Sequence, residues 1–348
     1  MKIGIIGLPQ VGKKALFELL TGHKPSENEV ASGKPVHGVA EIRDSRFDFL
    51  VGIYTPKKNV RARIEIELLP KIEKDAIAQG GIFEDIAEVD ALCHVVRAFK
   101  DDSIYHVNGS VDPKRDIDMV NSELLLHDLI FIEKRFERLD KKVKQTKEEA
   151  SVKERDILIK LKAHLDKELP LRTLELSADE KKALSSYPLL TRKDIIIALN
   201  VGESQLKEKP QVEGPNIMQV SAKVEAEIEA LESEEEKDAF LSDIGITEPA
   251  INILTTLLLK TLNLISFFTV GSDEVRQWTV KAGSAAPEAA GAIHSDLQKG
   301  FIRAEVIKFN DIKASGSEDT LKSQGKFYLK GKDYIVEDAD ILTIRFNV

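Results

Sequence analysis

The stretch that most constrains the fold of this chain is its N-terminus, MKIGIIGLPQVGKKALFELLTG. An apolar run, Lys2–Ile6, leads into the turn Gly7–Lys13 and then into an amphipathic helical pattern. The turn fits the phosphate-loop rule G-x-x-x-x-G-K, and the strand before it and helix after it are the context which that motif requires. Gly7 and Gly12 permit backbone conformations that turn several N–H groups toward one anion. The sequence therefore predicts a phosphate-binding loop in a parallel α/β layer.

The residue after the loop lysine departs from the rule, which asks for Ser or Thr. That hydroxyl is a direct Mg²⁺ ligand in phosphate-loop NTPases, and this chain has Lys14 in its place. An ammonium repels a cation, so either magnesium has other anchors or Lys14 itself supplies positive charge. The predicted phosphate contacts are Gly7, Leu8, Pro9, Gln10, Val11, Gly12, Lys13, Lys14 and Ala15.

Apolar runs separated by polar helical stretches extend the α/β pattern along the chain. Strands are expected at Val39–Ile42, Arg63–Leu69, Ala91–Ala98, Asp194–Leu199 and Ile217–Val220. The polar stretch Ser26–Pro35 has no periodicity and is expected to be a mobile loop.

Two helical patterns interrupt this α/β layer. Apolar residues recur at spacings of three and four over Leu125–Val143 and again over Leu158–Leu169, which predicts an antiparallel hairpin with its turn near Glu148–Ser151. Lys134–Lys147 carries seven Lys or Arg residues against two acids. Such an arm could contact RNA phosphates, but charge alone favours an ordinary solvated helix face.

With 348 residues, the chain is too long for one ordinary core. We predict a phosphate-loop domain over 1–118 and 189–265, a helical insertion over 119–188 and an α+β domain over 266–348. The net charge of −9 argues against a general polyanion binder. No apolar run approaches membrane-spanning length, the N-terminus begins directly with a core strand, and the one cysteine, Cys93, is expected in the core. A cytoplasmic monomer is the simplest expectation.

Two short motifs follow predicted strands on the C-terminal side of the insertion. Asn200-Val201-Gly202-Glu203 stands where phosphate-loop GTPases have Asn-Lys-x-Asp, whose aspartate pairs with guanine. Glu203 is one methylene longer than aspartate, so pairing with guanine should be weaker. Ser221-Ala222-Lys223 follows the next strand, at the usual place of a second base-contacting loop. The predicted base contacts are Asn200, Val201, Glu203, Ser221, Ala222 and Lys223.

Together these motifs resemble the Obg-like ATPase family, the YchF type of translation-factor-class phosphate-loop protein. Shared stretches include GLPQVGK, VDPKRDID, NVGE, VSAKVEAEI and most of the C-terminal region from FFTVGSDEVRQWTV to the end. The resemblance implies an ATP-preferring nucleotide domain, with ATP or ADP favoured over GTP, a helical-hairpin insertion and a C-terminal ubiquitin-like TGS domain. It also implies association with a ribosome or RNA through the helical arm and the TGS domain.

The chain departs from that family on the magnesium and switch side. Glu67 and Pro70, in IELLPK, stand where the family has the aspartate and glycine of Asp-x-x-Gly, and proline has no N–H for a γ-phosphate. The following switch loop is rewritten as IEKDAIAQGG, and Ser32 is the nearest hydroxyl to the first switch threonine. We therefore assign no catalytic residue and no metal ligand, and magnesium binding stays open.

Three functions remain open at this stage. The first is a nucleotide-binding regulator of translation with weak or absent hydrolysis. The second is a working ATPase with altered metal use. The third is an interaction module whose nucleotide pocket is a relic.

Overall fold

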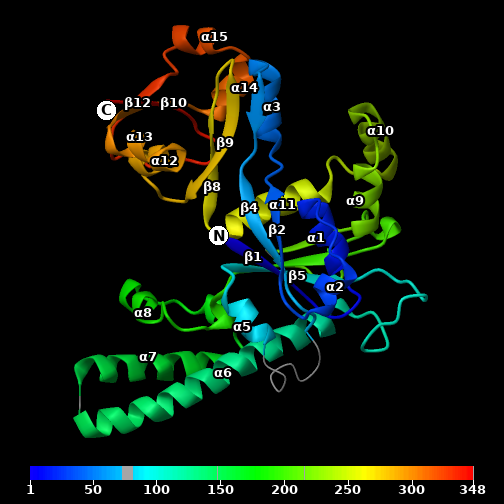
Figure 1. Cartoon of the computed structure of the whole chain (residues 1–348), viewed down its shortest axis with the longest axis vertical. Coiled ribbons are helices and arrows are strands. Elements are labelled where there is room, and N and C mark those ends of the chain that lie inside the picture. Colours follow the sequence, from blue (N-terminus) through cyan, green and yellow to red (C-terminus); the bar gives the residue numbers. More distant parts are fainter. Residues whose placement is uncertain (73–80, 147, 215, 348) are drawn as a thin grey trace. The chain divides into compact units, whose positions relative to one another are not determined.

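The computed structural model describes residues 1–72, 81–146, 148–214 and 216–347. They form two compact units: the first comprises Met1–Gly38 and Glu65–Ala250, and the second comprises Val39–Ile64 and Ile251–Val348. Figure 1 labels their helices and strands. Among the described residues, no helix has the length and apolarity needed to cross a bilayer.

The first unit is built on a six-stranded sheet with the order β2-β4-β1-β5-β6-β7. Its strands are β1 (Lys2–Ile6), β2 (Val36–Glu41), β4 (Arg63–Leu68), β5 (Ala91–Arg97), β6 (Ile195–Asn200) and β7 (Ile217–Val220). The pairs β1–β4, β1–β5, β5–β6 and β6–β7 are parallel. Every residue of β5 is buried, as its continuous apolar sequence predicts for a central strand. The predicted parallel layer is therefore confirmed, with strand ends that move by one to three residues.

The first unit also contains shorter helices. They are α1 (Lys13–Thr21), α2 (Glu27–Ala31), α5 (Ile82–Ala87), α8 (Ala178–Ala183), α9 (Ala222–Glu229) and α10 (Glu234–Ile244), with single turns η1 (Leu171–Thr173), η2 (Leu190–Arg192) and η3 (Glu203–Gln205). The helix α2 lies inside the stretch expected to be a loop, so that prediction was wrong. The side chains of Ser26 and Glu29 each accept a hydrogen bond from the other residue's backbone N–H, and this pair caps α2. Such a cap is a local signal that hydrophobic periodicity does not detect.

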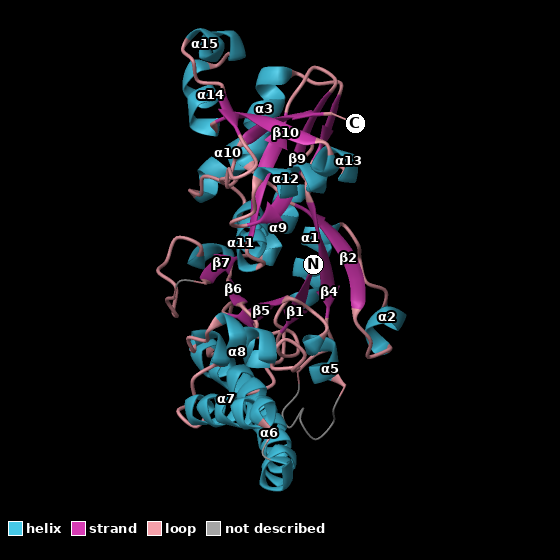
Figure 2. Cartoon of the chain, turned by 90° about the vertical axis from the view of Figure 1, so that its left-hand side faces the viewer, coloured by secondary structure: helices cyan, strands magenta, loops and turns pink. Residues whose placement is uncertain are grey.

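The insertion is the predicted helical hairpin. α6 (Pro113–Thr146) and α7 (Glu149–Leu165) lie side by side in both views (Figures 1 and 2). Their contact is apolar and includes Ile132, Leu139, Leu158 and Leu161. α7 ends at Leu165, so the helical pattern predicted up to Leu169 was too long, and Leu169 is exposed.

The second unit contains a six-stranded mixed sheet with the order β11-β10-β12-β8-β9-β3. Its elements are α3 (Ser45–Tyr54), β3 (Lys58–Val60), α11 (Ala250–Thr261), β8 (Leu264–Thr269), β9 (Glu274–Lys281), α12 (Ala286–Ile293), α13 (Ser295–Lys299), β10 (Phe301–Ile307), α14 (Phe309–Ser315), α15 (Glu318–Ser323), β11 (Tyr328–Lys330) and β12 (Ile341–Phe346). The predicted α+β character is confirmed. The stretch DYIVED forms no named strand and makes an isolated bridge, from Ile335 to Ala285.

An early part of the sequence completes this C-terminal sheet. β3 pairs in parallel with β9, and the side chains of Phe47 and Leu50 in α3 pack with Phe268 and Val275. The chain therefore leaves the first unit within β2 and returns to it within β4.

Candidate functional site

The phosphate loop has the backbone that its glycines predict. Gly7 has φ 148° and Gly12 has φ 100°, a region that favours glycine, and Gln10 between them has φ 58°. A Cβ on Gly7 would lie 2.4 Å from the carbonyl oxygen of Val95 in β5. The loop therefore packs too closely on the sheet to accept a side chain at its first position.

Lys13 begins α1 directly behind this loop, and Gly12 is the N-cap. Its ammonium donates a hydrogen bond to the carbonyl oxygen of Gly7. Burial, with a smaller contribution from Lys71, lowers the pKa of Lys13 to about 7. A phosphate would stabilise the charged ammonium, and the positive end of α1 would add to the attraction. The loop therefore has the charge as well as the shape to bind an anion.

Asn200 joins the phosphate loop to the predicted base-contacting side. Its side-chain amide donates to the carbonyl oxygen of Val11 at 3.0 Å and accepts from the backbone N–H of Ala222 at 3.1 Å. A Cβ on Gly12 would lie 2.2 Å from the amide nitrogen of Asn200. One buried side chain therefore fixes the distance between the two loops.

The other predicted base contacts separate into buried and exposed residues. Val201 is buried and its N–H bonds to the carbonyl of Val220, while Ser221 is the buried N-cap of α9. Glu203 and Lys223 are exposed, and Lys223 lies 3.8 Å from Glu227. The structure thus brings Asn200, Ser221 and Ala222 together with the phosphate loop and leaves the two charged side chains facing solvent.

Sequence reasoning missed Arg97, which organises the loop next to Asn200. Its buried guanidinium donates to the carbonyl oxygens of Phe99, Asp101 and Ile104, and it lies 4.5 Å from the centre of the Phe99 ring. The backbone N–H of Phe99 bonds to the carbonyl of Asn200. An arginine ending a strand that is apolar apart from His94 was the available signal, because a buried guanidinium requires partners.

Glu67, the acid at the expected magnesium position, is engaged elsewhere. Its Oε1 lies 3.3 Å from the ammonium of Lys2 and 3.3 Å from Nδ1 of His37. Both partners are on neighbouring strands of the same sheet, β1 and β2. The carboxylate is therefore held by two basic side chains and is a poor ligand for a divalent cation.

The other positions on the metal side do not supply ligands either. Lys14 is an exposed cation in the first turn of α1, and the hydroxyl of Ser32 donates to the carbonyl of Glu29 at the end of α2. Within the described ranges, no group of three His, Cys, Asp or Glu side chains could hold a metal. The residues present do not fit the magnesium site that the fold family implies. The rewritten switch stretch falls mostly on 73–80, outside the described residues.

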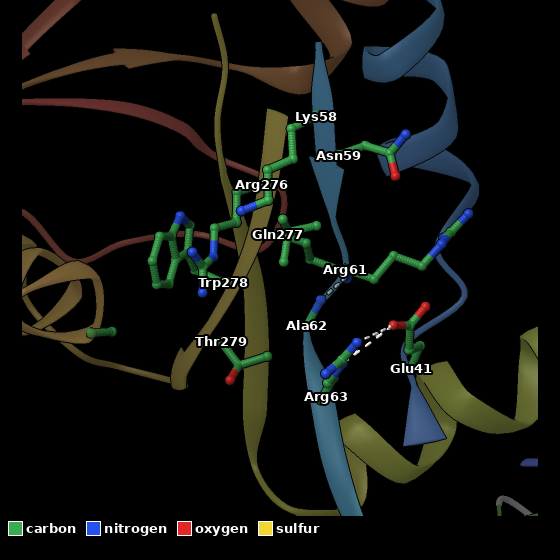
Figure 3. Close-up of a pocket in the computed structure, with 12 residues that line it drawn as sticks. Glu41, Lys58, Asn59, Arg61, Ala62, Arg63, Arg276, Gln277, Trp278 and Thr279 are labelled. Carbon is green, nitrogen blue, oxygen red and sulfur yellow. Dashed lines mark hydrogen bonds and ion pairs between the residues drawn. The ribbon is translucent and has the colours of Figure 1, made fainter. Parts of the chain in front are cut away.

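A second polar cavity, of about 620 Å³, lies in the second unit where the chain leaves β3 beside β9 (Figure 3). Its cations include Lys58, Arg63 and Arg276. Arg276 lies over the Trp278 ring at 4.1 Å, and the other ring contact of Trp278 is a stacked one with Phe267. Trp278 thus contacts both the Phe267 ring and the Arg276 guanidinium.

Not every cation of this cavity faces the same way. Arg61 extends to the other side of β3, where it lies over Phe47 and pairs with Asp48 (Figure 3). Arg63 pairs with Glu41 at 2.8 Å, and Lys58 pairs with Glu274 at 3.4 Å. Arg276 approaches Glu274 only at 3.9 Å, and among the described residues its guanidinium makes no hydrogen bond. It is the cation of this cavity best placed to bind an anion.

Cys93 lies within β5 and is fully buried, as expected. Burial raises the pKa of its thiol to about 12, so it is a core residue and not a nucleophile.

Known proteins resemble this chain over its whole length. Residues 264–347 match the family described as YchF-GTPase_C, Protein of unknown function (DUF933). A Bacillus subtilis protein named Ribosome-binding ATPase YchF is 40% identical over 363 residues, covering 99% of each chain. A Haemophilus ducreyi protein of the same name is 39% identical over 362 residues, covering 100% of this chain and 99% of the relative. The solved Schizosaccharomyces pombe YchF GTPase superimposes with a TM-score of 0.82 at 30% identity, covering 99% of this chain and 97% of that one.

Proposed function

The chain belongs to the YchF family, and from that premise we propose that it is a purine-nucleotide-binding, ribosome-associated regulator with weak or absent hydrolysis. The observation that carries the nucleotide part is the Asn200 side chain, which connects the phosphate loop to the N-terminus of α9. Both hydrogen bonds are buried, so removing the amide would leave the Val11 carbonyl and the Ala222 N–H without this partner.

The proposed nucleotide contacts are those that the sequence indicates: Gly7 to Ala15 on the phosphate side, and Asn200, Val201, Glu203, Ser221, Ala222 and Lys223 on the base side. ATP or ADP is preferred over GTP, because Glu203 replaces the shorter aspartate that pairs with guanine. Glu203 is exposed at the start of η3 and has room to move.

Weak hydrolysis follows from the chemistry of phosphoryl transfer. The reaction depends on neutralising the charge that develops on the transferred group and on positioning the attacking water. Glu67 is engaged by Lys2 and His37, and Pro70 has no N–H to offer a γ-phosphate. An active ATPase with altered metal use is the alternative, and a relic nucleotide pocket is the second alternative.

The ribosome is the proposed partner because relatives that are 39–40% identical over the whole chain are named ribosome-binding ATPases. We propose contacts through the helical arm, 119–188, and through a C-terminal TGS domain, 266–348, with 1–118 and 189–265 as the nucleotide domain. The cavity at Arg276 supports an RNA contact, since guanidinium groups bind phosphates and stack on bases. The protein would then act as a monomer in the cytoplasm.

Nucleotide binding is tested by the thermal unfolding of the full chain with ATP, ADP and GTP. A ligand that binds only the native state at 100 times its Kd stabilises it by about 2.7 kcal/mol. We expect ATP and ADP to raise Tm, GTP to raise it less, and Lys13→Ala to abolish the shifts. No shift with any nucleotide would favour the relic pocket, and multiple turnovers of ATP by the purified protein would favour the active ATPase.

A further inference from the structure

The polar cavity of the second unit contains a cation that lies against an aromatic ring. The Cζ atom of Arg276 is 4.1 Å from the centre of the Trp278 ring, and we call these two residues the Arg–Trp pair. The ring has two further contacts: its Nε1 donates to the hydroxyl oxygen of Thr269 at 3.0 Å, and it stacks with the buried ring of Phe267. These contacts fix the indole, which in turn limits the positions open to the guanidinium.

The guanidinium of Arg276 is only weakly engaged by acids. Within the described part of the chain, its ion pair is with Glu274 at 3.9 Å, at the outer limit of such a contact. Its side chain is 38% exposed, so a ligand can reach it. Val60 lies opposite Arg276 in the register of β3 and β9, and both Val60 and Ala292 of α12 line the same cavity. The guanidinium therefore borders a cavity that also has apolar side chains.

Two further cations lie near the Arg–Trp pair. Lys58 begins β3 and pairs with Glu274 at 3.4 Å, and Arg63 begins β4 and pairs with Glu41 at 2.8 Å. Figure 3 shows Lys58 above the Arg–Trp pair and Arg63 below it. Both ion pairs are partly exposed to solvent, so each contributes little stability and a phosphate can compete for the cation.

This combination of groups fits an unpaired RNA nucleotide better than a double helix. An arginine guanidinium stacks on the face of an RNA base, and such a face is accessible only where the base has left a duplex. An A-form helix presents its phosphates and 2′-hydroxyls, and basic groups alone are enough to bind them. The cavity instead presents a guanidinium positioned by an indole, next to apolar side chains and between two other cations.

We propose that this cavity binds an unpaired nucleotide of RNA, whose base stacks on the Arg276 guanidinium and whose flanking phosphates bind Lys58 and Arg63. The proposal rests on the RNA contact proposed above for the same cavity, and it specifies the kind of RNA and the role of each cation. Arg276 acts through its planar guanidinium as well as through its charge. Lysine cannot replace it, because an ammonium has no plane on which a base can stack.

Trp278 is the only tryptophan of the chain, so its fluorescence reports directly on this cavity. The test titrates the full chain with a short oligouridylate strand and with the same strand annealed to oligoadenylate. A strand of the same length without bases is measured by competition. The pyrimidine strand avoids the purine site proposed for the first unit. We expect the single strand to change the Trp278 emission and to bind about tenfold more tightly than the abasic strand, and the duplex to leave the emission unchanged.

Arg276→Lys separates stacking from charge, because the variant keeps the charge and loses the planar group. It should weaken binding of the single strand about tenfold and of the abasic strand less than twofold. Arg276→Gln should weaken both. The matched control is Lys281→Gln, an exposed charge on the same strand, which should change neither. Retained binding of the abasic strand shows that Arg276→Lys is folded.

The outcomes separate this proposal from the RNA contact itself. The proposal is wrong, and the contact stands, if single strand and duplex bind equally, if intact and abasic strands bind equally, or if Arg276→Lys binds as the wild type does. It is also wrong if free UMP binds as tightly as the strand, because the ligand would then be a mononucleotide.

If no RNA changes the Trp278 emission, the proposal is wrong. Normal cosedimentation of Arg276→Gln with ribosomes would then show that the RNA contact proposed for this cavity fails as well. Neither result bears on nucleotide binding by the first unit.

Discussion

The two sides of the nucleotide site differ in how their polar groups are used. On the base side, the amide of Asn200 bonds to Val11 in one loop and to Ala222 in the other, and both bonds are buried. On the metal side, Glu67 is engaged with Lys2 and His37 instead of facing the phosphate loop. On the base side, the amide of Asn200 therefore holds the two loops at a fixed distance from each other. The metal side contains basic side chains, which attract anions.

This difference agrees with the proposed function, in which the molecule binds a nucleotide and hydrolyses it weakly or not at all. Binding needs the loop backbone, the lysine and the Asn200 bridge, which are all present. Hydrolysis additionally needs a positioned metal and a positioned water, and the described residues on the metal side do not provide them. Substitutions that alter one side only therefore test whether the two sides differ in this way.

The largest effect is expected from Asn200→Ala on the base side. The change leaves the Val11 carbonyl and the Ala222 N–H without their side-chain partner, which costs about 2–4 kcal/mol of unfolding free energy for two buried groups. The affinities for ATP and for ADP should fall together, because the two loops are no longer held at a fixed distance from each other. Urea denaturation and calorimetry measure the two effects, with the exposed Ser204→Ala in η3 as control.

If Asn200→Ala unfolds like the wild type and binds ATP normally, the bridge between the loops has no energetic role. That result would remove the main support for an intact base side.

The next effect is a pH dependence that comes from Lys13. Its pKa in the free protein is lowered to about 7, and a bound phosphate favours the charged form and raises it. Affinity should therefore be highest below pH 7 and fall as pH rises through 7 toward the bound pKa, by up to about tenfold per pH unit. Lys71 acts on this group electrostatically. His94 stays neutral, because burial, with a smaller contribution from Lys13, lowers its pKa to about 3.

Lys13→Arg is the control for this titration. Arginine keeps its charge over the whole range, so the slope in the variant reports only the titration of the nucleotide. Equal slopes of log Kd against pH in the two proteins would show that Lys13 is fully charged before the nucleotide binds.

A smaller effect is expected in the second unit. Arg276→Gln removes the cation held on Trp278 and should weaken ribosome binding by about threefold to tenfold, while the slope of log K against log salt falls by about one. Cosedimentation with ribosomes at several salt concentrations measures both quantities. Lys281→Gln, an exposed charge on the same strand, should behave like the wild type.

A loss of binding in both variants would show that only general charge matters, and a loss in neither would exclude this cavity as an RNA contact.

The smallest effect is expected from Glu67→Gln on the metal side. Its partners are partly exposed, so the loss of its contacts with Lys2 and His37 should cost about 1 kcal/mol or less. ATP affinity should change by less than twofold, with or without Mg²⁺. A large loss of Mg²⁺-dependent binding would show that Glu67 leaves Lys2 and His37 to coordinate a metal.

Local signals were enough to predict much of the first unit. Apolar runs located β1, β5, β6 and β7, and the glycines of the phosphate loop indicated its shape. The order of motifs placed Asn200 beside the loop because carboxyl ends of parallel strands meet at one edge.

Features that depend on long-range contacts were not predictable. Lys58–Val60 is three residues long with two of them exposed, so nothing in its pattern indicates that it pairs with β9 more than 200 residues later. The pairing of Glu67 with Lys2 and His37 depends on the register of three strands. The place of Lys71 depends on a hydrogen bond from its neighbour Ile72 to Gly7.

The most direct test of this account is the apparent Kd of the wild-type protein for ATP across a magnesium series from EDTA to a large excess. The account predicts that affinity is highest in EDTA and stays level or falls as Mg²⁺ sequesters the free nucleotide. An affinity that rises tenfold or more with Mg²⁺ would contradict it, because the ligand would then be the metal complex, which the described residues on the metal side do not fit.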